Sequence, residues 1–140
     1  EGESTQRPIA YRVLYGWHAT KAHDRLFSGW TDHPRTFFRL PDGRRTSAAG
    51  AYQITATSWD DMRQRRPGVY VDFGPGMQDL WAMDRTAWRG ALDDVLLGRL
   101  ELACAKCAKE WTSLPGGPEQ GQDLVRAQRV FQQWGGRLSA

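Results

Sequence analysis

Short stretches of apolar residues at helical spacing, separated by Pro and Gly, most strongly limit what this sequence can fold into. Apolar side chains recur three or four positions apart in residues 47–66, 75–88, 91–97, 98–111 and 124–134. This spacing places them on one face of an α-helix, which Gly or Pro then ends. The sequence predicts a further helix from Pro8 to about Ala19, with Ile9, Val13 and Trp17 on its apolar side.

One β feature interrupts the helices. Thr36–Phe38 and Arg44–Thr46 are separated by Pro41-Asp42-Gly43, a pattern typical of a hairpin with a Gly-assisted turn. The stretch from Lys21 to Asp32 has no periodicity and is expected to be a loop. The prediction is an α+β fold in a single domain spanning 1–140, with residues 1–6 loose.

The net charge is only +3 and the pI about 9.1, and Lys and Arg are scattered rather than grouped on one stripe. This distribution does not favour nucleic-acid binding, although mild basicity suits an anionic polymer or envelope.

No apolar run approaches the roughly 20 residues of a membrane span. No signal peptide is visible; since the sequence starts at Glu1 rather than Met, the export route is left unassigned. We expect five or six of the seven Trp to lie in the core.

Two cysteines, Cys104 and Cys107, form a lone C-x-x-C on the apolar side of a predicted helix. Structural metal sites usually add a second pair. We therefore predict reduced core thiols rather than a redox or metal role for this pair.

Several blocks of sequence together resemble the lambda-type phage endolysins, a family of lysozyme-like proteins. The blocks are Thr31-Asp32-His33-Pro34-Arg35, Ser47 to Ile54, Asp72 to Pro75, Gln78-Asp79, Arg89 to Leu92, Glu110 to Gly116, and Gly121-Gln122. Each block is weak alone, but they occur in the family's order and spacing across most of the chain.

The resemblance implies a helical lobe, a small β-lobe, and a cleft that holds a glycan strand. The family cleaves peptidoglycan between N-acetylmuramic acid and N-acetylglucosamine as a lytic transglycosylase, without metal or cofactor. Only one acid is needed, because a hydroxyl of the muramic acid is the attacking group. In the family this acid is a Glu at the end of the first helix, followed by Gly and Thr.

Here that segment reads Trp17-His18-Ala19-Thr20, so His18 occupies the Glu position and only Thr20 matches. The family's Tyr-Gly-Gln is also altered, to Gln120-Gly121-Gln122, and the loop between His18 and Asp32 is shorter than in the family. These departures fall at the expected cleft.

His18 and Glu119 are the leading candidates for the catalytic acid. An imidazole at His18 can donate a proton near neutrality but lacks a carboxylate's negative charge; a helix-end or surface role is the favoured alternative. Glu119 lies in a loop that faces the cleft in the family, and is the first candidate for a relocated acid. Asp24 and Asp32 come next, although Asp32 is expected to accept backbone hydrogen bonds or to pair with Arg35. Glu110 is expected to be exposed.

The resemblance places Thr20, Tyr52, Gln53 and Gln122 near the glycan strand. A Gln amide could bond to an N-acetyl group; alternatively, Tyr52 packs in the core and Gln53 bonds to backbone. We predict that His33 is packed or bonded to backbone and is not a metal ligand.

Two functions remain open from the sequence. One is a lysozyme-fold protein that recognises peptidoglycan strands, or a protein partner, with cleavage lost or reduced. The other is an active endolysin or effector that uses Glu119 or His18. Both act at the bacterial cell wall or in the periplasm.

Overall fold

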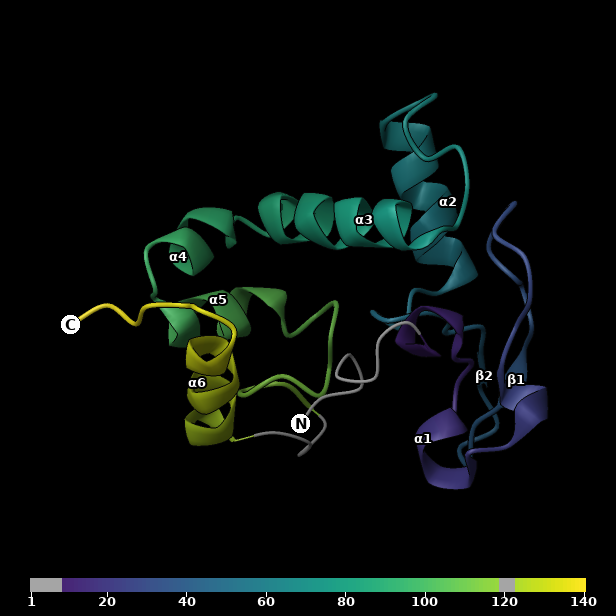
Figure 1. Cartoon of the computed structure of the whole chain (residues 1–140), viewed down its shortest axis with the longest axis horizontal. Helices are drawn as coiled ribbons and strands as arrows, with labels where there is room; N and C mark the ends of the chain where they lie inside the picture. Colours follow the sequence, from purple (N-terminus) through teal and green to yellow (C-terminus); the bar gives the residue numbers. More distant parts are fainter. Residues whose placement is uncertain (1–8, 119–122) are drawn as a thin grey trace. The chain divides into compact units, whose positions relative to one another are not determined.

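The computed structural model describes residues 9–118 and 123–140, and His18 by its backbone. Its contacts divide the chain into two compact units, Glu1–Ala82 and Met83–Ala140. The number of domains stays a prediction. Figure 1 shows the elements of each unit.

Unit 1 combines short helical pieces with one hairpin. In chain order these are the 3₁₀ turn η2 (Ile9–Arg12), α1 (Trp17–Thr20), η3 (His23–Arg25), β1 (Phe38–Arg39), β2 (Arg45–Thr46), α2 (Ala56–Arg65) and the first part of α3 (Pro75–Trp88). The two strands are antiparallel, with Phe38 opposite Thr46 and Arg39 opposite Arg45. The hairpin prediction is confirmed.

Unit 2 is helical in its described residues. It holds the end of α3, then α4 (Leu92–Leu96), α5 (Leu100–Cys107) and α6 (Leu124–Gln133). Gly98 separates α4 from α5 and adopts φ 73°, a left-handed conformation that favours glycine. The helices near 75–88, 91–97 and 124–134 lie where the sequence predicts them. Helix α5 ends at Cys107, four residues before the predicted end.

The predicted helix from Pro8 to Ala19 is wrong. Val13 and Leu14 form isolated β-bridges with Leu26 and Ala49, and Gly16 turns the chain at φ 82° before α1 begins. Long-range bridges that bury Val13 and Leu14 therefore replace the continuous helix. The loop predicted from Lys21 to Asp32 also contains the short η3.

Helix α2 begins nine residues later than predicted. Residues 47–54 form a turn in which Ala49 pairs with Ile54 and Gly50 adopts φ 77°. Thr55 then starts the helix, because its side chain accepts a hydrogen bond from Ser58 N.

The largest fully buried side chains, Trp59, Phe73, Ile54, Gln78 and Val13, all belong to unit 1. The rings of Trp59 and Phe73 meet edge to face with centroids 4.9 Å apart. Of the seven tryptophans, Trp17, Trp59 and Trp81 are buried, Trp30 and Trp111 are partly buried, and Trp88 and Trp134 are exposed. Across the described ranges, no helix is long and apolar enough to cross a bilayer.

Candidate functional site

Helix α1 presents the positions at which the family resemblance places catalysis. It is a single turn, with left-handed residues before it at Gly16 (φ 82°) and after it at Lys21 (φ 53°). Trp17 is buried, whereas Ala19 and Thr20 are exposed. Trp17 therefore anchors the turn and leaves its far end at the surface.

The hydroxyl of Thr20 is used within this turn. It donates to Gly16 O (3.3 Å) and accepts from Ala22 N (3.2 Å). These bonds close the last turn of α1 and fix the chain that leaves it. A substrate contact by Thr20 stays a prediction.

Backbone bonds attach the segment before α1 to the 47–54 turn. Tyr15 N donates to Ala48 O (3.1 Å), and Gly50 N donates to Val13 O (2.8 Å). The segment that leads into α1 is thus held beside the turn that contains Gln53; a shared glycan site for these residues stays a prediction.

Tyr52 and Gln53 both have partners inside the protein. The Tyr52 hydroxyl donates to Asp79 Oδ1 (2.7 Å), which also accepts from the Tyr11 hydroxyl (2.9 Å). Gln53, at φ 48°, donates from Nε2 to Gly50 O (3.0 Å). These bonds agree with the packing and backbone-bonding alternative; glycan binding by either residue stays a prediction.

Asp32 is a structural carboxylate. Its Oδ1 accepts from His33 N (2.8 Å), Trp59 Nε1 (3.1 Å) and Arg63 Nη1 (3.2 Å), and its Oδ2 lies 3.5 Å from Arg35. Desolvation raises the pKa of Asp32, but these hydrogen bonds and the two arginine charges bring it below its ordinary value. Asp32 is therefore held ionised and is a poor proton donor, and its predicted structural role is confirmed.

His33 is packed and bonded to backbone, as predicted. Its Nε2 lies 2.8 Å from Ile54 O, and its Nδ1 accepts from Arg35 N (3.0 Å). Its ring meets Phe73 edge to face. Burial, with the nearby Arg35 charge, holds the pKa of His33 below its ordinary value. Among the described residues, no three His, Cys, Asp or Glu side chains gather as a metal site would require.

Of the other acidic candidates, Asp24 lies exposed in η3. Glu119 and Gln122 lie outside the described residues. The expectation for Glu110 is wrong: its side chain is 5% exposed and pairs with both Arg85 and Arg89 in unit 2. The Glu110 carboxylate, which follows α5, is buried because the guanidinium groups of Arg85 and Arg89 neutralise its charge.

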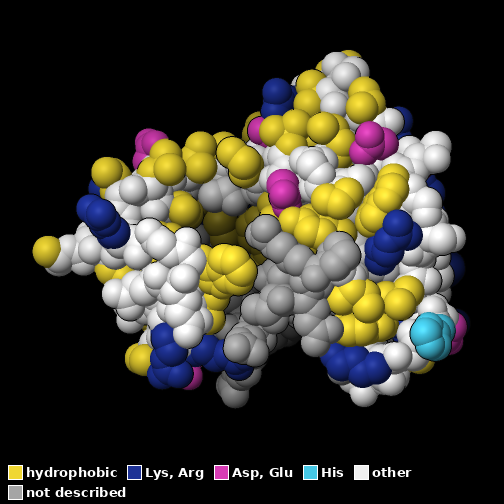
Figure 2. All heavy atoms as spheres, viewed as in Figure 1, with side chains coloured by type: hydrophobic (Ala, Val, Ile, Leu, Met, Phe, Trp, Pro, Cys, Tyr) yellow, Lys and Arg dark blue, Asp and Glu magenta, His cyan; other side chains and the backbone are white. Residues whose placement is uncertain are grey.

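Two basic residues that contact α1 and its neighbouring residues, Arg25 and Lys21, were not predicted from the sequence. Arg25 Nη1 donates to Tyr15 O (2.8 Å), and its guanidinium lies 3.9 Å from the centre of the Phe38 ring. Lys21 Nζ lies 4.0 Å from the centre of a Trp17 ring. Both residues come from the aperiodic stretch 21–32, so no spacing signal could have identified them. Figure 2 shows Lys and Arg side chains beside hydrophobic ones on this part of unit 1.

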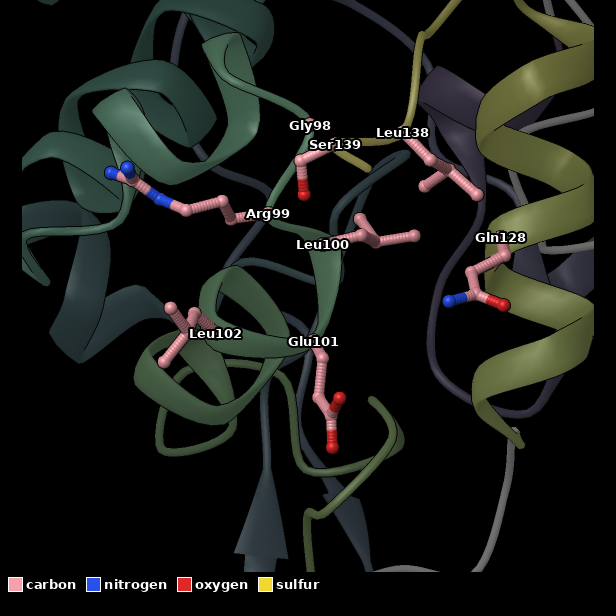
Figure 3. Close-up of a pocket in the computed structure, with 8 residues that line it drawn as sticks. All are labelled: Gly98, Arg99, Leu100, Glu101, Leu102, Gln128, Leu138 and Ser139. Atoms are coloured by element: carbon pink, nitrogen blue, oxygen red, sulfur yellow. The ribbon is translucent and has the colours of Figure 1, made fainter.

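A separate open hollow of about 380 Å³ lies in unit 2, between α5, α6 and the C-terminal residues (Figure 3). Leu100 and Leu138 point toward Gln128 of α6, whereas Arg99 and Leu102 point away. The hollow contains none of the site residues predicted from sequence.

Comparison with known proteins decides the family. The profile of the Endolysin family matches residues 1–138. This chain belongs to the endolysin family. The resemblance stated from the sequence blocks is confirmed.

Two endolysin relatives are similar in sequence. The endolysin of Escherichia phage lambda is 33% identical over 115 residues, covering 82% of this chain and 67% of the relative. The endolysin of Escherichia phage P2 is 36% identical over 98 residues, covering 65% of this chain and 57% of the relative. The chain thus spans about two thirds or less of these proteins.

Solved structures of bacteriophage lambda lysozyme share the fold of this endolysin-family chain. One, complexed with a chitohexasaccharide, has a TM-score of 0.78 at 31% identity, covering 96% of this chain and 83% of the other. A second has a TM-score of 0.75 at 28% identity with the same coverage. The predicted α+β lysozyme-like fold is confirmed.

Proposed function

We propose that this chain recognises the N-acetylmuramic acid–N-acetylglucosamine strands of peptidoglycan at the bacterial cell wall, and that strand cleavage is lost or much reduced. Membership of the endolysin family supports a peptidoglycan-degrading role. The lambda lysozyme structure that contains a chitohexasaccharide supports glycan binding by this fold.

The composition of α1 is the main support for lost or reduced cleavage. Its four residues are Trp17, His18, Ala19 and Thr20, with no carboxylate among them. The carboxylate of Asp32, another candidate acid, is committed to hydrogen bonds that favour its ionised form. His18 then has to deliver the proton that the family takes from Glu.

The chemistry of an imidazole makes this substitution costly. The acid protonates the leaving oxygen, and its conjugate base is used in the second step. A carboxylate also stabilises the positive charge that develops on the sugar, whereas an imidazole does not. Loss of a positioned acid costs about 10²–10⁴-fold in rate.

The test is digestion of purified sacculi, with release of soluble sugars followed over time. The wild type should stay near background. His18→Glu, alone or with Ala19→Gly, should raise the rate by about 10²-fold or more. The matched control His23→Glu adds the same charge to an exposed residue of η3 and should add no activity.

Rapid digestion by the wild type would contradict the proposal and favour the alternative, an active enzyme with a relocated acid. Glu119→Gln would then abolish the activity if Glu119 is that acid. Mass spectrometry distinguishes 1,6-anhydro products of transglycosylation from the reducing ends of hydrolysis.

A further inference from the structure

The β1–β2 hairpin places two arginines directly opposite each other on an exposed face. Arg39 and Arg45 are cross-strand partners, and both are exposed. Like charges at directly opposite positions of an antiparallel pair destabilise it. This arrangement costs the free protein stability.

The other arginines of the hairpin region are neutralised by carboxylates. Arg35 makes a two-pronged contact with Asp60, at 2.9 and 2.7 Å. Arg44 pairs with Asp42 at 2.7 Å. In the described parts of the chain, Arg39 and Arg45 have no such ion pair. The arginines at these two paired positions are therefore the ones left available to an outside anion.

The opposite face of the hairpin is attached to unit 1. Phe38 and Thr46 are half-buried, and the Arg25 guanidinium lies over the Phe38 ring. Because side chains alternate across a strand, this attachment directs Arg39 and Arg45 toward solvent.

An exposed aromatic ring completes this outward face. Phe37 immediately precedes β1 and is 48% exposed. The Arg45 guanidinium lies 4.7 Å from the centre of its ring. Residues Phe37, Arg39 and Arg45, here called the hairpin face, thus offer two guanidinium groups beside an apolar surface.

We propose that the hairpin face binds the carboxylates of the peptides attached to the peptidoglycan strand. Paired guanidinium groups hold a carboxylate through charge-assisted, bidentate hydrogen bonds. The Phe37 ring packs against the apolar part of the same peptide. This inference rests on the proposed function, since it takes the polymer to be peptidoglycan; it adds the peptides to the glycan as a recognised component.

The experiment compares binding to two forms of sacculi, intact and with their peptide carboxylates converted to amides by a carbodiimide and ammonia. Wild-type protein should bind intact sacculi about tenfold more tightly, as expected when charge-assisted hydrogen bonds to a carboxylate are gained. Arg39→Gln/Arg45→Gln should lose this preference and still bind the amidated sacculi. The control Arg44→Gln/Arg65→Gln removes the same charge from exposed arginines that have carboxylate partners, and should keep the preference.

Equal binding of the two forms by the wild type would overturn this inference alone, whereas absent binding to both forms would overturn the proposed function. Equal losses of binding in both double variants would also overturn the hairpin-face inference, because the change in net charge would then explain the loss. Binding to phosphatidylglycerol vesicles that depends on Arg39 and Arg45, without any effect of amidating the sacculi, would likewise overturn the inference. In the free protein, Arg39→Thr should raise the thermal midpoint by removing the like-charge pair; a lower midpoint would contradict the repulsion argued here.

Discussion

The side chain of Gln78 lies directly over the Cα of Gly50. Gln78 Oε1 accepts from Ala51 N (3.0 Å), while its Nε2 donates to Tyr11 O (3.0 Å) and Phe73 O (2.9 Å). Gln78 is fully buried. One amide thus connects η2, the 47–54 turn and the start of α3, and a glycine at position 50 leaves room for it.

Gly50→Ala should therefore destabilise the protein strongly. A Cβ at position 50 would overlap Gln78 Oε1 and lie 2.7 Å from its Cδ, at a backbone φ of 77°. Left-handed strain and the disrupted buried hydrogen bonds should together cost about 3–5 kcal/mol in urea unfolding. Gly43→Ala, also left-handed but with no atom within 4 Å, should cost only about 1–2 kcal/mol.

The double variant Gly50→Ala/Gln78→Ala checks the cause. Removing Gln78 removes the overlap, so the two costs should add to clearly more than the cost of the double variant. Simple additivity would contradict the contact between these two residues.

Unfolding stability should fall as the pH drops from 7.5 to 5 because of His33. The neutral ring donates from Nε2 to Ile54 O and accepts from Arg35 N at Nδ1, so a proton on Nδ1 would face another N–H. The folded pKa is below the ordinary value, whereas the unfolded chain takes up the proton near about pH 6.5. The unfolded state thus binds more protons in this window, and acid favours it.

His33→Gln should be less stable at pH 7.5 but should lose less stability down to pH 5. His23→Gln, at an exposed position, should keep the wild-type pH dependence. The pKa of Asp60, lowered by the Arg35 hydrogen bond, and that of Asp32 add further acid sensitivity only below about pH 4. An unchanged slope in His33→Gln would refute the assignment.

The thiols of Cys104 and Cys107 should react slowly in the native protein. Each residue is 5% exposed, and burial raises the pKa of both thiols. Because the thiolate is the reactive form, modification by DTNB at pH 8 should wait for local opening. We expect a rate on the order of 100-fold slower than in 6 M guanidinium chloride; comparable rates would show that α5 leaves the thiols accessible.

Patterns that depend on local spacing were predictable from the sequence. The hairpin turn, the Pro75 start of α3, the Gly98 break and the apolar side of α5 each follow from residues within one element. The Asp32 role also followed, because a short polar side chain in a loop commonly accepts hydrogen bonds from neighbouring backbone groups. The packed role of His33 followed from its place inside a motif of the family.

Features that depend on distant partners were not predictable. Val13 and Leu14 have helical spacing but are drawn into bridges with Leu26 and Ala49, which lie far along the chain. The position of Arg25 over Phe38 likewise arises only in the folded chain. For the site, the sequence gives the identity of residue 18, whereas the partners that hold Tyr52 and Gln53 appear only in the structure.

Glu110 offers a prediction that sequence periodicity could not supply. Its carboxylate accepts from Arg85 and from Arg89, whose Nε lies 2.8 Å away. The Arg85 side chain is 8% exposed, so a neutral residue at position 110 would remove a carboxylate that pairs with a buried guanidinium charge. Glu110→Gln should therefore reduce the free energy of unfolding by about 3–5 kcal/mol.

The matched control is Glu101→Gln on the exposed side of α5, which should change stability by less than about 0.5 kcal/mol. Both variants remove one negative charge from unit 2, so any difference between them reports the local partners rather than net charge. If urea unfolding gave the same small effect for both, the Arg85 charge would have to be solvated, and the ion pair would contribute as little as a surface pair.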